Sequence, residues 1–368
     1  MDPGKYCHLT IQPYLTEQRI FKEARALNDY CPETVIIAPG DGAESFRNGI
    51  RVVTYYAKSP LLRIIKSYYL ALKMRTRVYH LHDPELLILG WCFRLFTSAA
   101  IIYDAHRPTF HYFMWRYGPG GFTTRFKATV LKFIEILGIV FIDGLIMASP
   151  RSKKGIGRFC QRKIVIPNFP EAALVKAPPN NIDRFALIYR WVIEKKADLE
   201  LILESFFQVI LVKPDARLIM AGPKSSHINP GLINRLRELK IEANVTFANL
   251  DDWFEHCGEN NIGLAVPNDD DYYRRGEQPE IYEFLAHGVP VICGRTPFTE
   301  AIVGDRETGV VLKTLNPLNV SEAVLKLFAD NEKLQESGEN AQCLAAHEFS
   351  WSKQVDRLNQ FYRSIFTR

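Results

Sequence analysis

The sequence predicts an α/β protein made of two doubly wound domains, each with a parallel sheet covered by helices. Three observations favour this fold class. The 368 residues, 47% of them hydrophobic, suit two domains with large cores better than one. Short apolar runs rich in β-branched residues alternate with helical patterns through both halves. Strands separated by helical segments of this length imply parallel sheets with right-handed crossovers.

Thirteen strands are predicted from this pattern. They are residues 6–11, 34–38, 51–55, 78–82, 100–103, 144–148, 163–166, 185–189, 216–221, 244–247, 262–266, 290–293 and 309–312. Helical patterns lie between most of them, for example at 17–30 and 61–75. Two prolines and two asparagines interrupt the pattern at 171–183, which predicts an N-terminal domain of residues 1–170 and a C-terminal domain of residues 171–350. We expect the last helix, 351–368, to pack back on the first domain.

The cysteines and the N-terminus indicate a cytoplasmic protein. The seven cysteines are scattered and form no CxxC pair, so they predict neither a disulfide framework nor a zinc site. The N-terminus lacks the basic and apolar segments of a signal peptide. No apolar run approaches the roughly 20 residues of a membrane-spanning helix. The expected locations are the cytoplasm and the inner surface of the plasma membrane.

Charge is divided unevenly along the chain. Residues 1–170 hold 24 basic and 12 acidic side chains, and the remaining residues hold 22 and 29. Such a basic half predicts an anionic partner, with an ordinary solvated surface as the alternative. A basic amphipathic helix at 61–75 and an aromatic cluster at 110–117 suit adsorption to anionic lipid headgroups. A core-packing helix with a solvated basic face is the other interpretation of 61–75.

Several segments, in order along the chain, carry a family resemblance. They read VYHLHDPELL from residue 78, IIYDAHRP from 101, GLIMASP from 144, KIVIPNFPE from 163, RFALIYRWVIEKKADLELILESF from 184, ARLIMAGP from 216 and PEIYEFLAHGVPVICG from 279. Together they resemble the retaining family 4 glycosyltransferases, which have the GT-B fold of two Rossmann-like domains facing across a cleft. The resemblance implies transfer of a sugar from a nucleotide diphosphate donor, most often a UDP-sugar, to a hydroxyl group. The acceptor we expect is a glycan or lipid-linked oligosaccharide in cell-surface polysaccharide assembly, and the basic and aromatic elements at 61–75 and 110–117 favour a polyprenyl-diphosphate-linked sugar at the membrane.

The most recognisable segment predicts part of the donor site. By resemblance, Glu283 holds the nucleotide ribose, and a carboxylate can accept hydrogen bonds from two vicinal hydroxyls. Helix N-terminal amides from Gly276 to Glu280 would face phosphate or sugar hydroxyls. The family often places a glutamate eight positions before Glu283, where this chain has Arg275. Either Glu277 or Glu280 substitutes for it, or the donor sugar is held otherwise; a carboxylate-bearing sugar would suit an arginine.

The first strand of the donor domain predicts the diphosphate site. By resemblance, Arg190 and a lysine five or six residues later, Lys195 or Lys196, contact the diphosphate. The leaving group develops negative charge in the transition state, which these cations would neutralise. Two glycines usual in the motif are replaced here by Tyr189 and Ala197.

The N-terminal domain is expected to present the acceptor side. The H-x-H-acid-P pattern at 80–84 resembles a segment of phosphatidylinositol mannosyltransferases, where the second histidine lies at the reaction centre. This makes His82 the leading catalytic candidate. Asp83, Glu85, Asp104 and His106 are further candidates at strand ends. We also expect Asp83 to cap a helix that begins at Pro84, and His80 to point to the opposite face of the strand from His82.

No metal and no cofactor are expected, and the nucleotide sugar is a substrate. The three aspartates at 269–271 are interpreted as a polar loop, although clustered carboxylates also suit divalent cations. The main alternative function is a non-catalytic GT-B scaffold or partner subunit, which the altered glycines and Arg275 favour. An oxidoreductase lacks support because no GxGxxG follows an early strand. The order of the motifs gives no support to nucleic-acid binding.

Overall fold

The computed structural model describes two compact units. The residues described are 5–13, 18–28, 33–117, 121–150, 155–171, 185–190, 196–222, 230–250, 252–257, 260–266 and 278–366. One unit comprises residues 1–168 with 352–368, and the other comprises residues 169–351. The division falls two residues before the predicted boundary. Most of the interrupted segment 171–183 lies outside the described residues.

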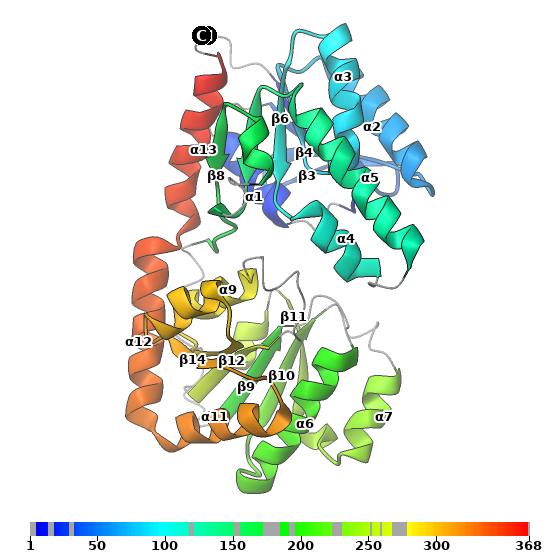
Figure 1. Cartoon of the computed structure of the whole chain (residues 1–368). Coiled ribbons are helices and arrows are strands. Elements are labelled where there is room, and N and C mark those ends of the chain that lie inside the picture. The colour runs from blue at the N-terminus through cyan, green and yellow to red at the C-terminus, as the bar shows by residue number, and fades with distance from the viewer. Residues whose placement is uncertain are drawn as a thin grey trace. The chain divides into compact units, whose positions relative to one another are not determined.

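The N-terminal unit contains an eight-stranded sheet in the order β3-β4-β2-β1-β5-β6-β7-β8 (Figure 1). Its strands are β1 (Tyr6–Leu9), β2 (Thr34–Pro39), β3 (Glu44–Arg47), β4 (Ile50–Tyr55), β5 (Val78–Leu81), β6 (Ala100–Ala105), β7 (Gly144–Met147) and β8 (Lys163–Val165). All neighbouring strands are parallel except β3, which pairs with β4 in an antiparallel hairpin. The sequence pattern missed β3 because its four residues are exposed and form no apolar run.

Helices cover both faces of this sheet. They are α1 (Gln18–Asn28), α2 (Pro60–Met74), α3 (Leu87–Phe96), α4 (Thr109–Tyr117), α5 (Phe122–Ile139) and α13 (Trp351–Phe366), with short 3-10 turns at Pro84–Leu86 and Ile156–Phe159. Ala71 of α2, Phe93 of α3 and Ile139 of α5 share one core with the sheet. Ile20 and Ala24 of α1 share a separate core with other sheet residues. This arrangement is a doubly wound sheet.

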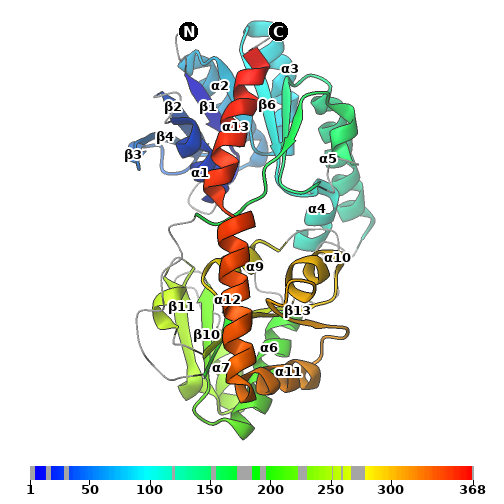
Figure 2. The same cartoon turned by 90° about the vertical axis from the view of Figure 1, so that its left-hand side faces the viewer.

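The last helix, α13, packs against the N-terminal sheet (Figure 2). The Tyr362 ring stacks on Tyr6 of β1 with centroids 5.4 Å apart. Phe361 approaches Gly144 of β7 so closely that a Cβ atom there would lie 2.8 Å from the Phe361 ring. Gly144 therefore leaves room for the helix, and α13 brings a tyrosine hydroxyl into the interior of the unit.

The C-terminal unit contains a six-stranded parallel sheet in the order β11-β10-β9-β12-β13-β14. Its strands are β9 (Phe185–Arg190), β10 (Arg217–Gly222), β11 (Val245–Asn249), β12 (Asn260–Ala265), β13 (Val291–Gly294) and β14 (Gly309–Leu312). Its helices are α6 (Lys196–Val212), α7 (Pro230–Glu238), α9 (Pro279–Ala286), α10 (Pro297–Thr299), α11 (Pro317–Ala329) and α12 (Asn331–Glu348), with single turns at Glu242–Asn244, Trp253–His256 and Glu300–Gly304. One core joins the sheet to α9 and α12, and another joins it to α6 and α11. All thirteen predicted strands are present, and the predicted fold class is confirmed.

Each sheet has a point where the strand order reverses. In the N-terminal unit the chain runs outward from β1 through β2 and then outward on the other side from β5. In the C-terminal unit the reversal lies between β9 and β12. Ligands of doubly wound domains bind beyond the carboxyl ends of the strands at such points. The residues that follow these strands are therefore the candidates for a site.

Candidate functional site

In the C-terminal unit, two predicted donor residues meet at the reversal point. Arg190 is the last residue of β9, and Glu283 lies on α9, the helix that follows β12. Nη1 of Arg190 forms an ion pair with Oε2 of Glu283, and the guanidinium lies 5.8 Å from the centroid of the Trp253 ring. The Arg190 side chain is only 7% exposed. Its Nε atom is buried and makes no hydrogen bond within the described residues.

The start of α9 offers further polar groups next to this pair. Gln278 occupies the N-cap position but its side chain makes no capping hydrogen bond, and its buried Oε1 has no partner among the described residues. Burial raises the pKa of Glu280, while Arg190 opposes that shift. Burial and then Arg190 lower the pKa of His287 to about 4. Uncapped N-terminal amides and a nearby guanidinium suit an anionic ligand.

Five other predicted donor residues are not placed by the structure. Lys195, Arg275, Gly276 and Glu277 lie outside the described residues, as do the aspartates at 269–271. Lys196 begins α6, but its side chain is also outside the described part. Their roles in binding the diphosphate and the sugar stay predictions.

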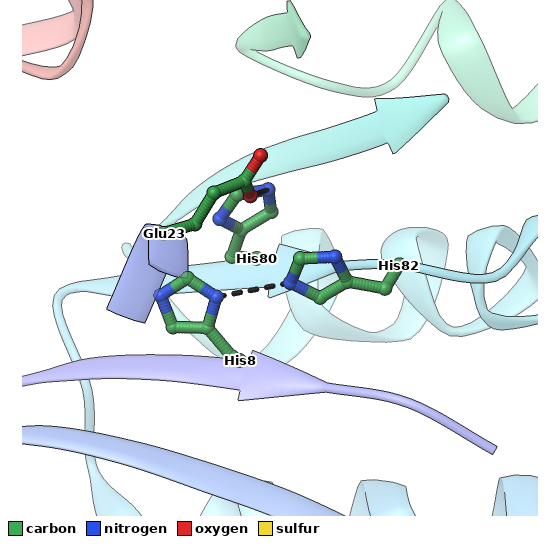
Figure 3. Close-up of side chains that lie close together, drawn as sticks. All are labelled: His8, Glu23, His80 and His82. Atoms are coloured by element: carbon green, nitrogen blue, oxygen red, sulfur yellow. Dashed lines mark hydrogen bonds and ion pairs between the residues drawn. The ribbon is translucent and has the colours of Figure 1, made fainter. Parts of the chain in front are cut away.

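In the N-terminal unit, three histidines gather beside the reversal point. His8 lies on β1, His80 on β5, and His82 directly after β5 (Figure 3). Nδ1 of His8 and Nε2 of His82 are 2.9 Å apart in a hydrogen bond. The rings of His80 and His82 stack with centroids 4.3 Å apart. The expectation that His80 points away from His82 is wrong, because residues two apart along an extended segment share a face.

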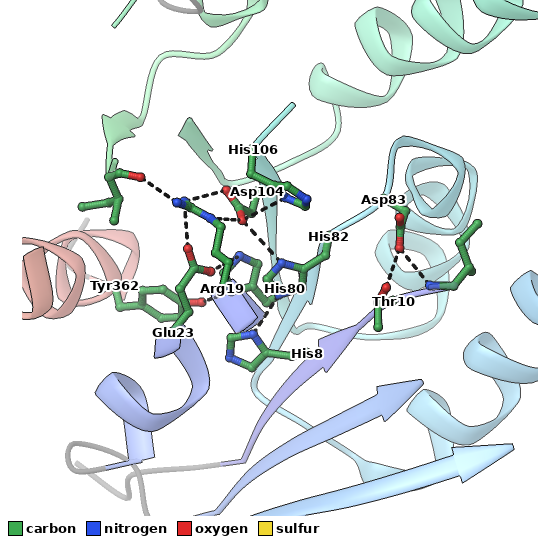
Figure 4. Close-up of polar contacts among 12 residues, drawn as sticks. His8, Thr10, Arg19, Glu23, His80, His82, Asp83, Asp104, His106 and Tyr362 are labelled. Carbon is green, nitrogen blue, oxygen red and sulfur yellow. Dashed lines mark hydrogen bonds and ion pairs between the residues drawn. The ribbon is translucent and has the colours of Figure 1, made fainter. Parts of the chain in front are cut away.

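A buried arginine connects this cluster to β6 (Figure 4). Arg19 of α1 donates from Nε and Nη2 to the two carboxylate oxygens of Asp104, at 2.7 and 3.0 Å. Its Nη2 also lies 2.8 Å from Oε1 of Glu23, and its Nη1 donates to the carbonyl of Ile166. Asp104 further approaches Nδ1 of His82 at 3.4 Å. One guanidinium is thus surrounded by two carboxyl groups and a carbonyl.

The two carboxyl groups respond oppositely to this environment. Burial alone would raise the pKa of Asp104, but Arg19 and hydrogen bonds from His106 and His82 hold it well below its usual range. Burial raises the pKa of Glu23 to about 8, and the opposing effect of Arg19 is too weak to prevent this. At neutral pH the cluster therefore contains an Asp104 carboxylate paired with Arg19 and a protonated Glu23.

The other acceptor-side candidates lie at the edge of this network. His106 Nδ1 is 3.3 Å from Oδ2 of Asp104, and its side chain is 13% exposed. Oδ2 of Asp83 accepts hydrogen bonds from Thr10 Oγ1 and Ile11 N, both at 2.8 Å. The expected capping role of Asp83 is wrong: it occupies the N-cap position, but its side chain is turned toward the end of β1 instead.

Glu85 has the properties of an acid–base group. Burial, followed by the nearby charge of Asp83, raises the pKa of Glu85 to about 7. A carboxyl group that titrates near neutrality can donate or accept a proton under physiological conditions. His82 is more enclosed, because its two ring nitrogens face His8 and Asp104. Burial lowers its pKa, so the ring is neutral at pH 7.

Two groups of described residues have the composition of a divalent-cation site. They are His8 with Glu23, His80 and His82, and His82 with Asp104 and His106; within each group the ligand atoms lie within 4.8 Å of one another. In the first group, Glu23 faces Arg19 and Nδ1 of His80 bonds the hydroxyl of Tyr362. The Arg19 guanidinium already supplies a positive charge at this point, which disfavours a second cation.

Four members of this network were not predicted from the sequence: His8, Arg19, Glu23 and Tyr362. A signal was present at His8 and His80, because each interrupts an otherwise apolar strand pattern with a polar side chain. Buried polar groups in such strands require partners. No sequence pattern identifies those partners. Arg19 and Glu23 lie on α1, and Tyr362 lies 282 positions after His80 in the chain.

We expect the free energy of unfolding of the N-terminal unit to fall on acidification. Burial lowers the folded-state pKa of His8, His80 and His82, so between about pH 6 and pH 5 the unfolded chain binds up to three protons that the folded unit excludes. Glu23 and Glu85, with raised folded-state pKa values, oppose this by about one proton each, because at this pH each is protonated only when folded. The net loss is therefore at most about one proton, or roughly 1.4 kcal/mol per pH unit.

Urea unfolding at pH 7, 6 and 5 measures this slope. His80→Gln should reduce it by roughly 1.4 kcal/mol per pH unit, since one titrating group is removed. An unchanged slope in this variant would contradict the assignment of His80 as a neutral buried imidazole. His256→Gln, on a surface turn of the other unit, serves as the control.

Comparison with known proteins agrees with the two-unit architecture. Residues 280–343 match the model of the family described as glycosyl transferases group 1. The chain resembles sucrose-phosphate synthase from Thermosynechococcus elongatus with a TM-score of 0.76 at 14% identity, covering 98% of this chain and 99% of that one. It resembles HepE from Anabaena, in complex with UDP-glucose, with a TM-score of 0.74 at 15% identity, covering 98% and 100%. A trehalose 6-phosphate synthase from Burkholderia multivorans gives a TM-score of 0.64 at 10% identity, covering 98% of each chain.

A search of curated proteins finds no significant match. At the identities above, the likeness to solved structures shows the fold alone, and that fold is GT-B. The family match covers α9, with Glu280 and Glu283, through most of α12. The predicted GT-B fold and the resemblance to glycosyltransferases are therefore confirmed.

Proposed function

We propose that this chain is a retaining glycosyltransferase that transfers a hexosyl or glycuronosyl group from a UDP-sugar to a hydroxyl group. The observation that carries the proposal is the Arg190–Glu283 pair, which places a cation and a carboxylate at the strand-order reversal and leaves Nε of Arg190 without a partner in the described structure. The family match of the α9 segment and the UDP-glucose bound to HepE support this donor class.

In this mechanism the acceptor hydroxyl attacks the anomeric carbon from the side that the nucleotide diphosphate leaves. The bond from that carbon to the diphosphate oxygen breaks, the new glycosidic bond forms, and the diphosphate receives the acceptor's proton. Arg190, with Lys196 or Lys195, neutralises the charge that develops on the diphosphate. Glu283 holds the ribose hydroxyls. The protein supplies positioning and electrostatics rather than a nucleophile or a metal.

On the acceptor side, the proposal places Glu85 and His106 nearest the reacting hydroxyl, with His82 and Asp104 behind them. The neutral ring of His82 and the titration of Glu85 near neutrality suit contact with uncharged hydroxyl groups. We propose a polyprenyl-diphosphate-linked oligosaccharide as the acceptor, in cell-surface polysaccharide assembly on the cytoplasmic face of the membrane. Arg275 would favour a donor sugar that carries a carboxylate.

Calorimetry with UDP, followed by a donor-hydrolysis assay over neutral and uronic UDP-sugars, tests this function. We expect UDP to bind, at least one UDP-sugar to be hydrolysed, and a chelator to leave the rate unchanged. Complete loss of activity with the chelator, restored by a divalent cation, would overturn the metal-free mechanism. UDP binding without turnover of any sugar would instead identify the non-catalytic partner subunit. Turnover of neutral donors alone would reject the role given to Arg275.

A further inference from the structure

The helices on one face of the N-terminal sheet carry most of the large apolar side chains that the described structure exposes. Fifteen of these lie on, or directly after, α2, α3 and α5, whereas the described residues of the C-terminal unit expose three, Leu211, Val212 and Leu318. The fifteen, here called the apolar face, are Leu61, Leu62, Ile65, Tyr69, Ile88, Trp91, Leu95, Phe96, Phe122, Phe126, Val130, Phe133, Leu137, Val140 and Phe141. A gathering of this kind marks an interaction surface.

Helix α5 has a complete outward stripe of apolar residues. Phe122, Phe126, Val130, Phe133 and Leu137 recur every three or four positions, so they line one side of the helix. Phe122 is 84% exposed, Phe126 58% and Phe133 61%. The helix buries a different side, with Ala128 and Ile139, against the rest of the unit. Packing of the domain therefore does not explain the outward stripe.

Contacts between the helices join their apolar residues into one surface. The rings of Trp91 on α3 and Phe141 after α5 lie 4.5 Å apart. In the core beneath, the buried Phe93 of α3 packs against Tyr68 of α2 with ring centroids 5.0 Å apart, which holds the two helices side by side. Figure 1 shows the three helices on the same side of the N-terminal sheet. The apolar face is thus a broad surface formed by three helices rather than a groove.

Charge on these helices has one sign. There are three basic residues in α2, one in α3 and three in α5, against a single acidic residue, Glu135, which is buried. Two of the seven cations are paired, Arg94 with Asp143 and Lys132 with Glu135. Arg125 and Lys127, which flank the α5 stripe, are exposed, as is Lys73 of α2. Two copies of such a face would bring like charges together, which disfavours self-association through it. Apolar side chains flanked by lysine and arginine instead match an anionic lipid surface.

We propose that the apolar face docks onto an anionic bilayer, with its aromatic and aliphatic side chains at the boundary between headgroups and acyl chains. Arg125, Lys127 and Lys73 would then lie at the level of the lipid phosphates. No helix among the described residues is long and apolar enough to span a membrane, so the attachment is peripheral. The proposal extends the lipid-linked acceptor of the proposed function and names the surface that would reach it.

Sedimentation of the full-length protein with vesicles tests the docking without any sugar transfer. We expect binding to phosphatidylglycerol-containing vesicles at low salt and much weaker binding to phosphatidylcholine vesicles. The double variant Phe126→Ser/Phe133→Ser should bind at least tenfold more weakly to the anionic vesicles, because two large apolar groups no longer insert. The matched control is Leu211→Ser/Val212→Ser, which removes two similarly exposed side chains, 63% and 65%, from the other unit and should bind like the wild type.

Two further measurements separate the alternatives. Arg125→Gln/Lys127→Gln should weaken binding to anionic vesicles by roughly tenfold and leave binding to neutral vesicles unchanged. Brominated lipids should quench tryptophan fluorescence less in Trp91→Phe than in Trp253→Phe, since Trp253 is buried in the C-terminal unit.

Failure of the wild type to bind anionic vesicles would overturn the proposal, as would equal binding by the Phe126/Phe133 variant. If that variant instead dissociates a dimer seen by analytical ultracentrifugation, the face is an interface between copies. Vesicle binding without UDP binding would reject the proposed enzyme function but not the docking surface.

Discussion

We expect Arg190→Gln to lower the rate of sugar transfer by about 100-fold or more, equivalent to roughly 3 kcal/mol of transition-state stabilisation. The physical reason is that Arg190 ends β9 at the strand-order reversal with its guanidinium largely buried, so its charge is poorly screened by water. A diphosphate leaving group would lose its nearest cation. Steady-state kinetics of transfer or donor hydrolysis measure the effect, which should fall mainly on kcat.

The ion pair with Glu283 complicates a single substitution, because Arg190→Gln also removes the partner of that carboxylate. The double variant Arg190→Gln/Glu283→Gln separates the two roles. We expect it to recover any melting temperature lost in the single variant while transfer stays at least 100-fold reduced. Recovery of activity in the double variant would contradict both the diphosphate role of Arg190 and the ribose role of Glu283, because the loss in the single variant would then come from the unpaired carboxylate. Arg235→Gln, which breaks an ion pair between α6 and α7, is the control and should leave the rate within about twofold.

The sequence predicted the strands well because most are short, buried apolar runs between polar segments; β8, β11 and β14 are less buried but keep an apolar pattern. β3 escaped prediction for the opposite reason: it is a wholly exposed hairpin strand held by pairing with β4. The candidate donor residues Arg190 and Glu283 were predicted from the family resemblance of their segments. The structure places them at the end of β9 and on α9, the helix that follows β12. Their direct pairing was not predicted, because it depends on how α9 lies over the end of β9.

The histidine cluster shows where sequence reasoning reaches its limit. The sequence singles out His80 and His82, but it predicts the wrong face of the strand for His80. Their partners come from α1, β1 and α13, so the chemistry of the cluster depends on tertiary packing. The protonation state of Glu23 in particular follows from complete burial next to an arginine that Asp104 already neutralises. Neither the partners of the two histidines nor the protonation state of Glu23 can be inferred from local sequence.

The two carboxyl groups around Arg19 should respond very differently to replacement by their amides. Asp104→Asn removes the ionised partner of a guanidinium that is 4% exposed, and we expect it to lower the free energy of unfolding by about 3–5 kcal/mol at pH 7. Glu23→Gln replaces a carboxyl group that is already protonated at that pH, so it preserves both shape and charge. We expect it to cost less than about 1 kcal/mol.

Urea unfolding of both variants at pH 7 and pH 9 tests this assignment. Raising the pH through the folded pKa of Glu23, about 8, must ionise a buried group that is ionised freely in the unfolded chain, so wild-type stability should fall between these pH values. Glu23→Gln should abolish that part of the fall, and Asp104→Asn should reduce it to the extent that Glu23 ionises in place of Asp104 at pH 7. Ionisation of Glu23 in place of Asp104 offsets part of the stability lost in Asp104→Asn. The double variant Asp104→Asn/Glu23→Gln leaves Arg19 without either carboxylate. It should therefore be the least stable of the three variants. Equal costs for the two single variants would mean that both carboxyl groups share the charge, and the neutral Glu23 assigned to this cluster would be wrong.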